Sequence, residues 1–378
     1  MTSPVPVLAE PPFVALDVTP LQNGHRRRGI GTYVRGLAWR LLEQDGVPIE
    51  LWGWADHRPF DHVPPPHRAL WLPRLGVPRT RFPALLRSAM KVRLGLSRAA
   101  AVHLTDPNSL ISSHRRSILT TVYDLIPLHD GPAAGGSAYQ AYLARVRAAA
   151  TVFAISQATA EDVVARLSVP QDRVVLAVPG IEIPAATELP VLPLRGPYFL
   201  FVGSPDPHKN IGVLLAALAA GDLPERLAIV GGWPVESLAE LRARVEAAGL
   251  EGRVEHLGFV DGATLLSLYR SATAVVLPSL IEGFGLPVAE ALAAGAPVIH
   301  SRLPVLEEVS AGVALTFEPA SAAELAGCLA RLSSDPALRA DLGAQGLQRA
   351  RALTWAKAVD GTVAAYRRAL SGDVPNSG

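Results

Sequence analysis

Short apolar runs alternate with longer amphipathic stretches along the first half of the chain. The apolar runs are four to six residues long and are bounded by polar, glycine- or proline-containing segments, which is typical of buried strands. The segment 58–68 holds four prolines and is expected to be a loop. We expect strands at residues 13–18, 49–54, 101–104, 117–122, 151–155 and 174–177, and helices at 32–42, 82–96 and 157–167, the last of them capped by Ser156.

A second series of the same kind begins after a proline-rich stretch. Residues 184–197 hold four prolines and little periodicity, so we expect them to form a linker. Strands that alternate with helices predict parallel sheets covered on both faces, so the fold class is α/β with two doubly wound domains, 1–183 and 198–355. Beyond the linker we expect strands at residues 198–202, 226–230, 253–256, 273–277 and 297–300, and helices at 211–220, 235–248, 263–269, 288–294, 324–332 and 355–370.

The composition narrows the class of protein. At 378 residues the chain is long enough for two domains of ordinary size. Hydrophobic residues make up 49%, yet no apolar run approaches the about 18 residues of a membrane-spanning helix. A net charge of +1 gives no nucleic-acid signature. The single cysteine, Cys328, excludes an internal disulfide and is expected to pack in the core, and the start of the chain does not resemble a secretion signal. We therefore expect a cytoplasmic protein.

Groups with binding chemistry gather between two glutamates eight positions apart, Glu282 and Glu290. Glycines flank Phe284 between them, and Pro287 precedes the expected helix 288–294. A helix start offers free N–H groups and the positive end of a dipole, which suits phosphate, and glycines let a ligand approach the backbone. Carboxylates accept hydrogen bonds, so sugar hydroxyls are natural partners. Glycine and proline between a strand and a helix also occur in α/β proteins that bind nothing at this position.

A second candidate anion site follows the strand expected at 198–202. Gly203 ends this strand, and Lys209 stands directly before the helix expected at 211–220. A lysine beside a helix N-terminus combines a full charge with backbone donors, which favours a phosphate. The alternative is a solvated lysine in an ordinary loop.

The ordered set of motifs resembles the signature of retaining glycosyltransferases of the GT-B fold, specifically glycosyltransferase family 4. The resemblance runs over residues 199–355, with weaker matches back to residue 16. It implies two Rossmann-like domains facing a central cleft, and a C-terminal helix, about 356–378, that packs back on the first domain. It also implies retaining transfer of a hexosyl unit from a nucleotide-diphosphate sugar to a glycan or lipid-linked acceptor.

The resemblance assigns roles to individual residues. Lys209 matches the lysine that holds the donor diphosphate, and the segment 253–260 matches the one that contacts the nucleotide base. Ser204 stands where relatives often carry arginine, and His208 is expected to supply part of that charge. The candidate donor-binding residues are Gly29, Gly31, Gly203, Ser204, His208, Lys209, Gly258, Phe259, Val260, Ser279, Glu282, Gly283, Phe284, Gly285, Leu286 and Glu290.

The acceptor side departs from the family pattern. Tyr123 stands where many relatives have histidine, at the end of an expected strand, while Asp124 keeps its place. Asp124 therefore joins the donor-side residues Glu282 and Lys209 as a catalytic candidate. The acceptor-side candidates are Tyr33, His103, Tyr123, Asp124 and His129.

No metal site or cofactor is expected beyond the nucleotide-sugar co-substrate. No Asp-x-Asp occurs in the sequence, so a metal clamp lacks its usual ligands. The run at 123–128, Tyr-Asp-Leu-Ile-Pro-Leu, resembles bacterial mannosyl- and rhamnosyltransferases of surface polysaccharides, which favours a GDP-linked hexose. The alternatives are a GT-B sugar-nucleotide epimerase, a nicotinamide-dependent oxidoreductase, and a catalytically inactive nucleotide-sugar-binding protein.

A basic segment at residues 79–98 suggests where a lipid-linked acceptor is met. It carries six arginine and lysine residues and no acidic residue. An amphipathic helix with such a charge can rest on an anionic bilayer, so peripheral contact with the inner face of the membrane is one expectation. The alternative is a helix that packs on the sheet while its arginines are solvated.

Overall fold

The computed structural model describes residues 12–54, 67–72, 96–109, 117–130, 136–183, 190, 192, 194 and 196–372. It divides into two compact units, Met1–Pro179 with Trp355–Gly378, and Gly180–Thr354. The boundary at Gly180 precedes the linker expected at 184–197 because the Ile181 amide donates to the Leu353 carbonyl at 2.8 Å, within the second unit. The helix expected at 82–96 and the basic segment 79–98 fall outside the described residues, except for residues 96–98.

In the first unit, the described strands form a seven-stranded parallel sheet in the order β3-β2-β1-β4-β5-β6-β7. Buried residues, mostly apolar, fill the central strands β1, β2, β4, β5 and β6, as expected for a sheet covered on both faces, whereas the edge strands β3 and β7 are partly exposed. The strands are β1 (Val14–Asp17), β2 (Ile49–Trp54), β3 (Arg68–Leu72), β4 (Ala101–Leu104), β5 (Ser117–Val122), β6 (Thr151–Ala154) and β7 (Val174–Leu176).

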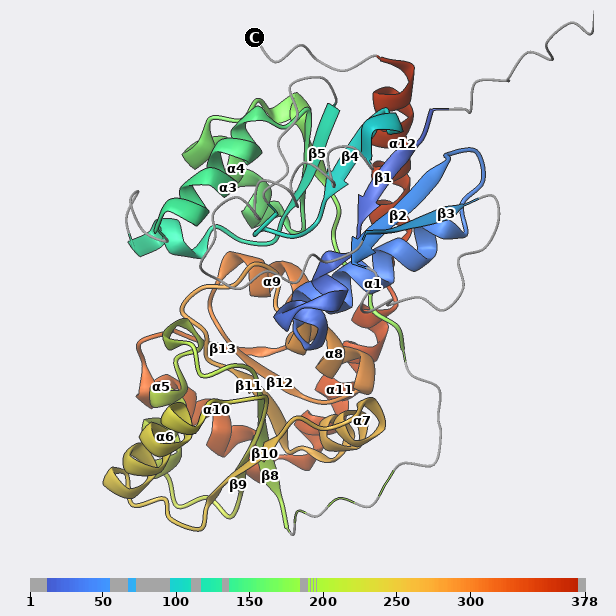
Figure 1. Ribbon diagram of the computed structural model, residues 1–378. Helices are drawn as coiled ribbons and strands as arrows, with labels where there is room; N and C mark the ends of the chain where they lie inside the picture. Colours follow the sequence, from blue (N-terminus) through green and yellow to red (C-terminus); the bar gives the residue numbers. More distant parts are fainter. Residues whose placement is uncertain are drawn as a thin grey trace, which may run out of the picture. The chain divides into compact units, whose positions relative to one another are not determined.

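Helices cover both faces of this sheet (Figure 1). The α-helices are α1 (Gly29–Leu42), α3 (Gly136–Ala148), α4 (Gln157–Leu167) and α12 (Ala356–Ser371). The shorter 3-10 helices are η1 (Thr19–Gln22), η2 (Gly24–Arg27), η3 (Leu96–Arg98), η4 (Ile126–Asp130) and η5 (Gln171–Arg173). The last helix, α12, contacts α1, β4 and β7, so the C-terminal segment belongs to the first unit. Ser156 caps α4 as expected, accepting from the Thr159 amide at 3.0 Å.

In the second unit, the described strands form a six-stranded parallel sheet in the order β10-β9-β8-β11-β12-β13. The order reverses between β8 and β11, and in the first unit between β1 and β4, which is the doubly wound pattern of nucleotide-binding folds. The strands are β8 (Tyr198–Val202), β9 (Arg226–Val230), β10 (Val254–Gly258), β11 (Ala274–Leu277), β12 (Val298–Ser301) and β13 (Leu315–Phe317).

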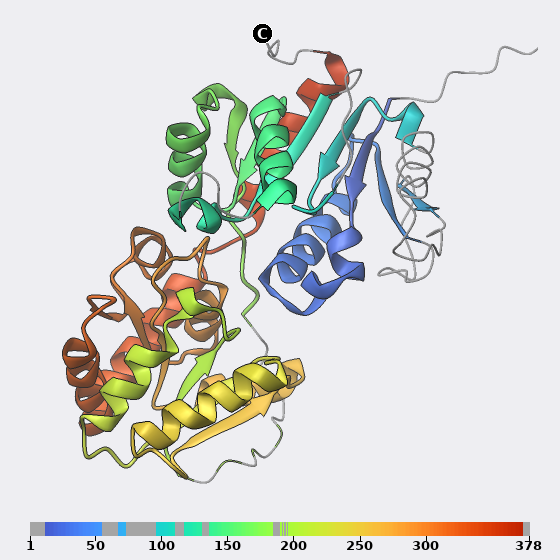
Figure 2. The same ribbon diagram turned by 60° about the vertical axis from the view of Figure 1, so that its left-hand side comes forward.

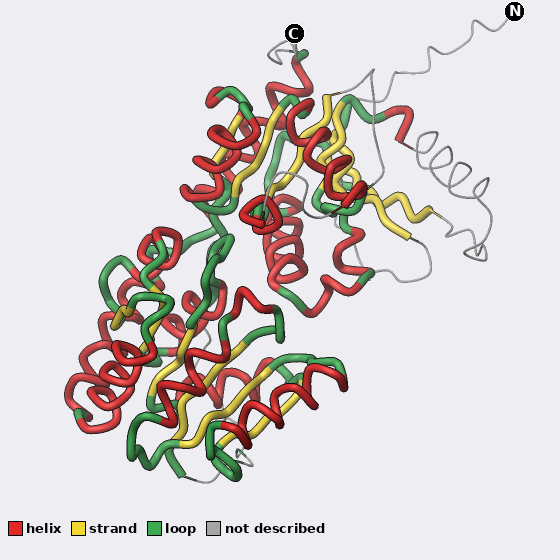
Figure 3. Tube along the Cα trace, turned by 90° about the vertical axis from the view of Figure 1, so that its left-hand side faces the viewer, coloured by secondary structure: helices red, strands yellow, loops and turns green. Residues whose placement is uncertain are grey.

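Figures 2 and 3 show helices flanking the sheet of the second unit as well. Its α-helices are α5 (Ile211–Ala219), α6 (Val235–Ala247), α7 (Gly262–Ser271), α8 (Leu286–Ala294), α9 (Pro304–Ser310), α10 (Ala322–Ser334) and α11 (Pro336–Ala350), and η6 (Pro207–Lys209) is a 3-10 helix. A core of leucine, phenylalanine and isoleucine side chains joins α5 and α10 to the sheet, and Cys328 packs against this core as predicted.

The fold class is the one that the alternating pattern predicts. Most of the expected elements appear within one or two residues of their expected bounds. The strand β3, the helices α3, α9 and α11, and the short strand β13 were not predicted.

Candidate active site

Lys209 and Glu282 meet at the carboxyl edge of the second sheet, although 73 positions separate them in the chain. Lys209 ends η6, which follows β8, and Glu282 lies in the loop between β11 and α8. Lys209 Nζ lies 2.6 Å from Glu282 Oε1, and the two side chains are only 16% and 8% exposed. Because the strand order reverses between β8 and β11, this pair lies at the switch point where open parallel sheets bind ligands.

Ser279 also holds Glu282. Its hydroxyl donates to the same Glu282 oxygen at 2.7 Å, and the residue is fully buried. The expectation that Ser279 contacts a sugar or phosphate is therefore corrected, because the hydroxyl is enclosed and already engaged. Two further bonds tie the loop of Glu282 to η6: the Leu280 amide donates to the His208 carbonyl at 2.7 Å, and the Asn210 side chain donates to the Pro278 carbonyl at 3.0 Å.

The helix α8 begins directly after the glycine-rich turn. Gly285 precedes its first residue with a φ of 90°, and a Cβ there would lie 2.4 Å from Leu306 Cδ2, so only glycine fits. The helix starts at the half-buried Leu286. In its first turn Pro287 has no N–H, and the Val288 and Ala289 amides donate to the Gly285 carbonyl at 2.9 and 3.3 Å. The Phe284 side chain is 3% exposed and packs in the core. Gly283, beside it, is also buried.

Glu290 lies on the second turn of α8 and is held by a neighbouring helix. The Tyr269 hydroxyl of α7 donates to Glu290 Oε2 at 2.8 Å, and Tyr269 is buried. Burial raises the pKa of Glu290, and this hydrogen bond opposes the shift in part. Sequence reasoning missed Tyr269, since a tyrosine in a helix gives no signal of where its hydroxyl points.

The segment expected to contact the base lies where β8, β9 and β10 end. His256 Nε2 lies 2.9 Å from the Gly231 carbonyl oxygen, and the Trp233 indole N–H donates to the Gly203 carbonyl at 2.9 Å. Burial lowers the pKa of His256. Phe259 is 55% exposed, and the adjoining Gly258 and Val260 are half-buried. These loops therefore form one polar and aromatic edge beside Gly203.

The β8–η6 loop itself also carries polar groups. Ser204 Oγ donates to Asp206 Oδ2, so this serine is engaged within its own loop. His208 is half-buried in η6, next to Lys209. The sequence placed both residues near the candidate anion site, and they lie on the same loop as Lys209.

In the first unit, the glycine loop forms the start of α1. Gly29 is exposed at its first position, whereas Gly31 is buried under η2. A Cβ on Gly31 would lie 2.5 Å from the His25 carbonyl oxygen and 2.6 Å from that of Arg26. Gly31 is therefore required for close packing of η2 over α1, a structural reason that the sequence did not reveal.

Two acceptor-side candidates are corrected by their burial. Tyr33 is 1% exposed and packs edge-on against Tyr123, with ring centres 5.6 Å apart. His103 is fully buried on β4, with Nδ1 2.7 Å from the Tyr366 hydroxyl oxygen and Nε2 2.8 Å from Thr121 Oγ1. Both side chains belong to the core of the first unit and are closed to an acceptor.

The remaining acceptor-side candidates lie at and beyond the end of β5. Tyr123 is 5% exposed and its hydroxyl donates to the Thr105 carbonyl at 3.0 Å, so this hydroxyl is also corrected as an acceptor contact. Asp124 is half-buried and accepts from the Ile126 amide at 3.1 Å. His129 is exposed, with Nε2 3.5 Å from Asp162 Oδ2. Asp124 and His129 remain accessible candidates.

A buried carboxyl pair at the ends of β1 and β4 was not predicted. Asp17 accepts from both the amide and the hydroxyl of Thr19, and from the amides of Thr105 and Asp106. Asp106 accepts from Asn23 Nδ2 at 2.9 Å. Burial and the neighbouring Asp106 raise the pKa of Asp17 to about 6. These bonds fix the switch point of the first sheet, and every carboxyl oxygen involved already has a protein donor.

The described part of the chain contains no group of three or more histidine, cysteine, aspartate or glutamate side chains that could hold a metal ion. None of its helices is long and apolar enough to cross a membrane.

Comparison with known proteins agrees with this geometry. The model of glycosyltransferase family 4 matches residues 27–183, and that of glycosyl transferases group 1 matches residues 188–349. The O-antigen chain mannosyltransferase B of Escherichia coli is 31% identical over 232 residues, which are 57% of this chain and 60% of that protein. The D-inositol 3-phosphate glycosyltransferase of Arthrobacter sp. (strain FB24) is 25% identical over an alignment of 399 residues, covering 95% of this chain and 94% of that protein.

Solved structures share the fold. Sucrose-phosphate synthase from Thermosynechococcus elongatus superposes with a TM-score of 0.73 at 24% identity, over 96% of this chain and 100% of that one. Anabaena HepE in complex with UDP-glucose superposes with a TM-score of 0.72 at 17% identity, over 95% and 99% of the two chains. The fold is thus that of the GT-B glycosyltransferases. The chain belongs to glycosyltransferase family 4 and is a glycosyltransferase.

Proposed function

We propose that this glycosyltransferase moves a hexosyl unit from a nucleotide-diphosphate sugar to a hydroxyl of a glycan or lipid-linked acceptor, with retention and without a metal ion. The observation that carries the proposal is the Lys209–Glu282 pair, 2.6 Å apart at the switch point of the second sheet and next to the start of α8. A cation and a carboxylate beside the positive end of a helix dipole are the groups that suit a sugar diphosphate.

In this proposal, the donor diphosphate lies against Lys209 and the positive end of the α8 dipole. These positive groups stabilise the negative charge that grows on the leaving nucleoside diphosphate. The diphosphate competes with Glu282 for Lys209, and Glu282 then accepts hydrogen bonds from hydroxyls of the transferred sugar. Glu290 binds a hydroxyl of the nucleotide ribose. A lysine and a helix end together supply the charge that a divalent cation supplies in metal-dependent transferases.

The donor and acceptor are proposed from the relatives. One relative is named as a mannosyltransferase of O-antigen chains, which supports a hexosyl donor and a glycan acceptor. Another is named for D-inositol 3-phosphate, which supports a small phosphorylated acceptor as the competing choice. The complex of HepE with UDP-glucose supports a UDP-sugar as well as the GDP-sugar favoured by the segment 123–128. Asp124 is the proposed acceptor-side residue.

The first test is transfer with a panel of UDP- and GDP-hexoses and short glycan or lipid-linked acceptors. The variants Glu282→Ala and Lys209→Ala should each lower the transfer rate by about 10²–10³, the usual loss for one electrostatic contact in a transition state. Glu240→Ala, which breaks an exposed ion pair with Arg244 on α6, is the matched control and should transfer normally. Near-normal turnover of Glu282→Ala would refute the assignment of the donor site.

The same assay tests retention and metal independence. We expect the anomeric proton of the product to show the configuration of the donor by NMR, and the initial rate to survive excess EDTA. Inverted product, or a rate restored only by Mg²⁺ or Mn²⁺, would contradict these parts of the proposal.

Two other functions make different predictions in this assay. A sugar-nucleotide epimerase would convert the donor into its epimer without any acceptor. A catalytically inactive protein would bind the nucleotide sugar and return it unchanged.

A further inference from the structure

Asn210 stands directly after Lys209 and has an unusual backbone conformation. Its φ is 54° and its ψ 39°, in the left-handed region that asparagine and glycine adopt most readily. It directly follows η6, and the next residue begins α5. The backbone therefore turns sharply at Asn210, and this turn sets the position of the Lys209 backbone relative to α5.

The side-chain amide of Asn210 links three loops at the carboxyl edge of the second sheet. Its Nδ2 donates to the Pro278 carbonyl at 3.0 Å and to the Pro319 carbonyl at 2.8 Å. Pro278 follows β11 and directly precedes Ser279, which holds Glu282. Both hydrogens of one amide group are thus used to join the loop of Lys209 to the loop of Glu282 and to the end of β13.

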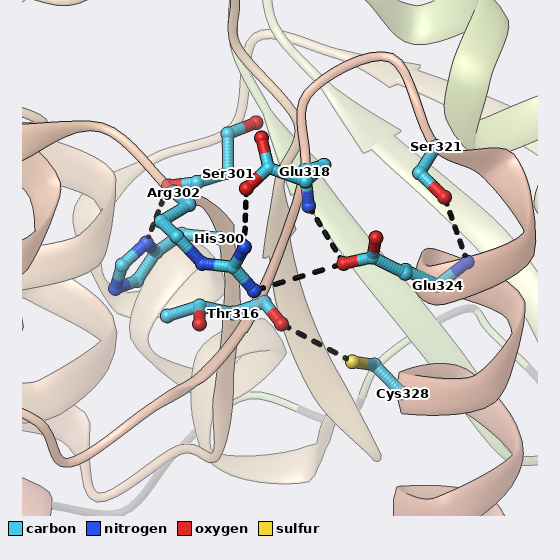
Figure 4. Close-up of polar contacts among 8 residues, drawn as sticks. All are labelled: His300, Ser301, Arg302, Thr316, Glu318, Ser321, Glu324 and Cys328. Atoms are coloured by element: carbon cyan, nitrogen blue, oxygen red, sulfur yellow. Dashed lines mark hydrogen bonds and ion pairs between the residues drawn. The ribbon is translucent and has the colours of Figure 1, made fainter.

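The third loop is itself held firmly, as Figure 4 shows. Arg302 pairs with Glu318 and, at 3.7 Å, with Glu324. The Glu318 amide donates to Glu324 Oε2 at 3.0 Å, and the Glu324 amide donates to Ser321 Oγ at 3.2 Å. Pro319 lies inside this bonded loop, so its carbonyl is a fixed acceptor for Asn210.

We propose that Asn210 is a positioning residue, which holds Lys209 in register with Glu282 for the donor diphosphate. The proposal rests on the proposed function, because it assigns the diphosphate to Lys209. The Leu280–His208 backbone bond and the Lys209–Glu282 pair itself also link the η6 turn to the loop of Glu282. A diphosphate that takes Lys209 away from Glu282 removes the second of these links, so the Asn210 bonds matter most when the donor is bound.

Two substitutions separate the amide from the backbone conformation. Asn210→Gly keeps the left-handed turn at no steric cost and removes both donors. Asn210→Asp keeps the size of the side chain but turns an acceptor oxygen toward two carbonyls. The control is Arg349→Ala, because Arg349 also donates to two main-chain carbonyls of the second unit, at 2.9 and 2.7 Å, but to Val309 and Glu308 at the end of α9.

The experiment measures the affinity of the full chain for UDP and for GDP by ligand-observed NMR, which reads millimolar dissociation constants, together with the melting temperature. We expect Asn210→Gly and Asn210→Asp to weaken binding about tenfold, as a small misplacement of a charged group does. Arg349→Ala should lower the melting temperature about as much as the Asn210 variants do, and should leave the nucleotide affinity unchanged. In the Lys209→Ala background, Asn210→Gly should change the affinity by less than about twofold, because its effect passes through Lys209.

Each other outcome is decisive. Wild-type affinity of Asn210→Gly, or a lower melting temperature alone, would make Asn210 a merely structural residue. The same loss with and without Lys209 would show that Asn210 does not act through it. If Lys209→Ala binds both nucleotides as the wild type does, or the wild type binds neither, the donor site itself is wrong and the positioning proposal falls with it.

Discussion

Acidification should weaken the first unit through His103, which lies fully buried between β5 and α12. Its two ring nitrogens lie 2.7 Å from the Tyr366 hydroxyl oxygen and 2.8 Å from Thr121 Oγ1, and its ring centre lies 4.6 Å from that of Phe153, with the rings tilted by 39°. Burial lowers the pKa of His103 from 6.5 to about 3. The imidazole is therefore neutral in the folded protein at any pH at which the chain is normally handled.

The size of the effect follows from this pKa difference. The unfolded chain takes up a proton on His103 below pH 6.5 and the folded chain does not, so stability is lost as the pH falls from about 6.5 toward about 3. One pKa unit corresponds to about 1.4 kcal/mol, so the loss at pH 5 is about 2 kcal/mol. Asp17 acts in the opposite direction. Its pKa is raised to about 6, so protonation stabilises the folded state by about 1.4 kcal/mol between pH 7 and 5.

Urea unfolding of wild type and His103→Gln at pH 7 and 5 isolates the contribution of the histidine, because Asp17 is present in both. Glutamine can donate to one hydroxyl and accept from the other without titrating. Five of the six tryptophans belong to the first unit, so their fluorescence follows its unfolding. The stability difference between wild type and variant should shift by about 2 kcal/mol between the two pH values. Parallel pH profiles would refute the reasoning.

Three further predictions concern packing and the candidate site. Gly31→Ala should lower the melting temperature by an amount equivalent to about 1–3 kcal/mol, as overpacking does, whereas Gly24→Ala, with nothing within 4 Å of its Cβ, should not. Tyr269→Phe removes the hydrogen bond to Glu290 and should weaken nucleotide binding by about fivefold, the value of one hydrogen bond. Asp124→Asn should lower the transfer rate by more than about tenfold, as loss of a charged group at the acceptor does.

Two tyrosine-to-phenylalanine variants serve as controls for the last two predictions. Tyr198→Phe also removes a hydroxyl that donates at 2.8 Å within the second unit, to the Leu268 carbonyl, and should leave nucleotide affinity unchanged. An equal loss in both tyrosine variants would indicate general destabilisation. Tyr123→Phe should retain turnover, since its hydroxyl faces the Thr105 carbonyl inside the protein. A larger loss from this variant than from Asp124→Asn would move the acceptor-side role away from the carboxylate.

The parallel sheets could be predicted because their strands are buried on both faces and therefore stand out as apolar runs. β13, Leu315–Phe317, has only three residues and no distinct apolar run of its own, and its pairing with β12 defines it. The helix α3, Gly136–Ala148, buries only Tyr142, Leu143 and Val146, so its apolar stripe is too narrow to recognise in a sequence rich in alanine. Local pattern thus finds elements with their own hydrophobic signal and misses those that depend on their neighbours.

The candidate site shows the same limit at the level of side chains. Lys209 and Glu282 could be predicted because each follows a strand whose carboxyl end must lie at one edge of the sheet. The direction of a hydroxyl could not be predicted, because Ser279 donates to Glu282 inside the protein rather than pointing toward a ligand. The bond between His103 and Tyr366 could not be predicted either, because these residues are 263 positions apart and meet only where α12 packs on the first unit.

That return of α12 has a consequence for the synthesis of the chain. The first unit is encoded in two pieces, separated by the whole of Gly180–Thr354. At about 5–20 residues per second, a ribosome needs roughly 10–35 s to make the intervening unit. During this time β1 to β7 have left the ribosome, but the surface that receives Tyr366 is still uncovered. The unit that starts first is therefore completed last, and a newly made chain depends on its final helix to close its opening domain.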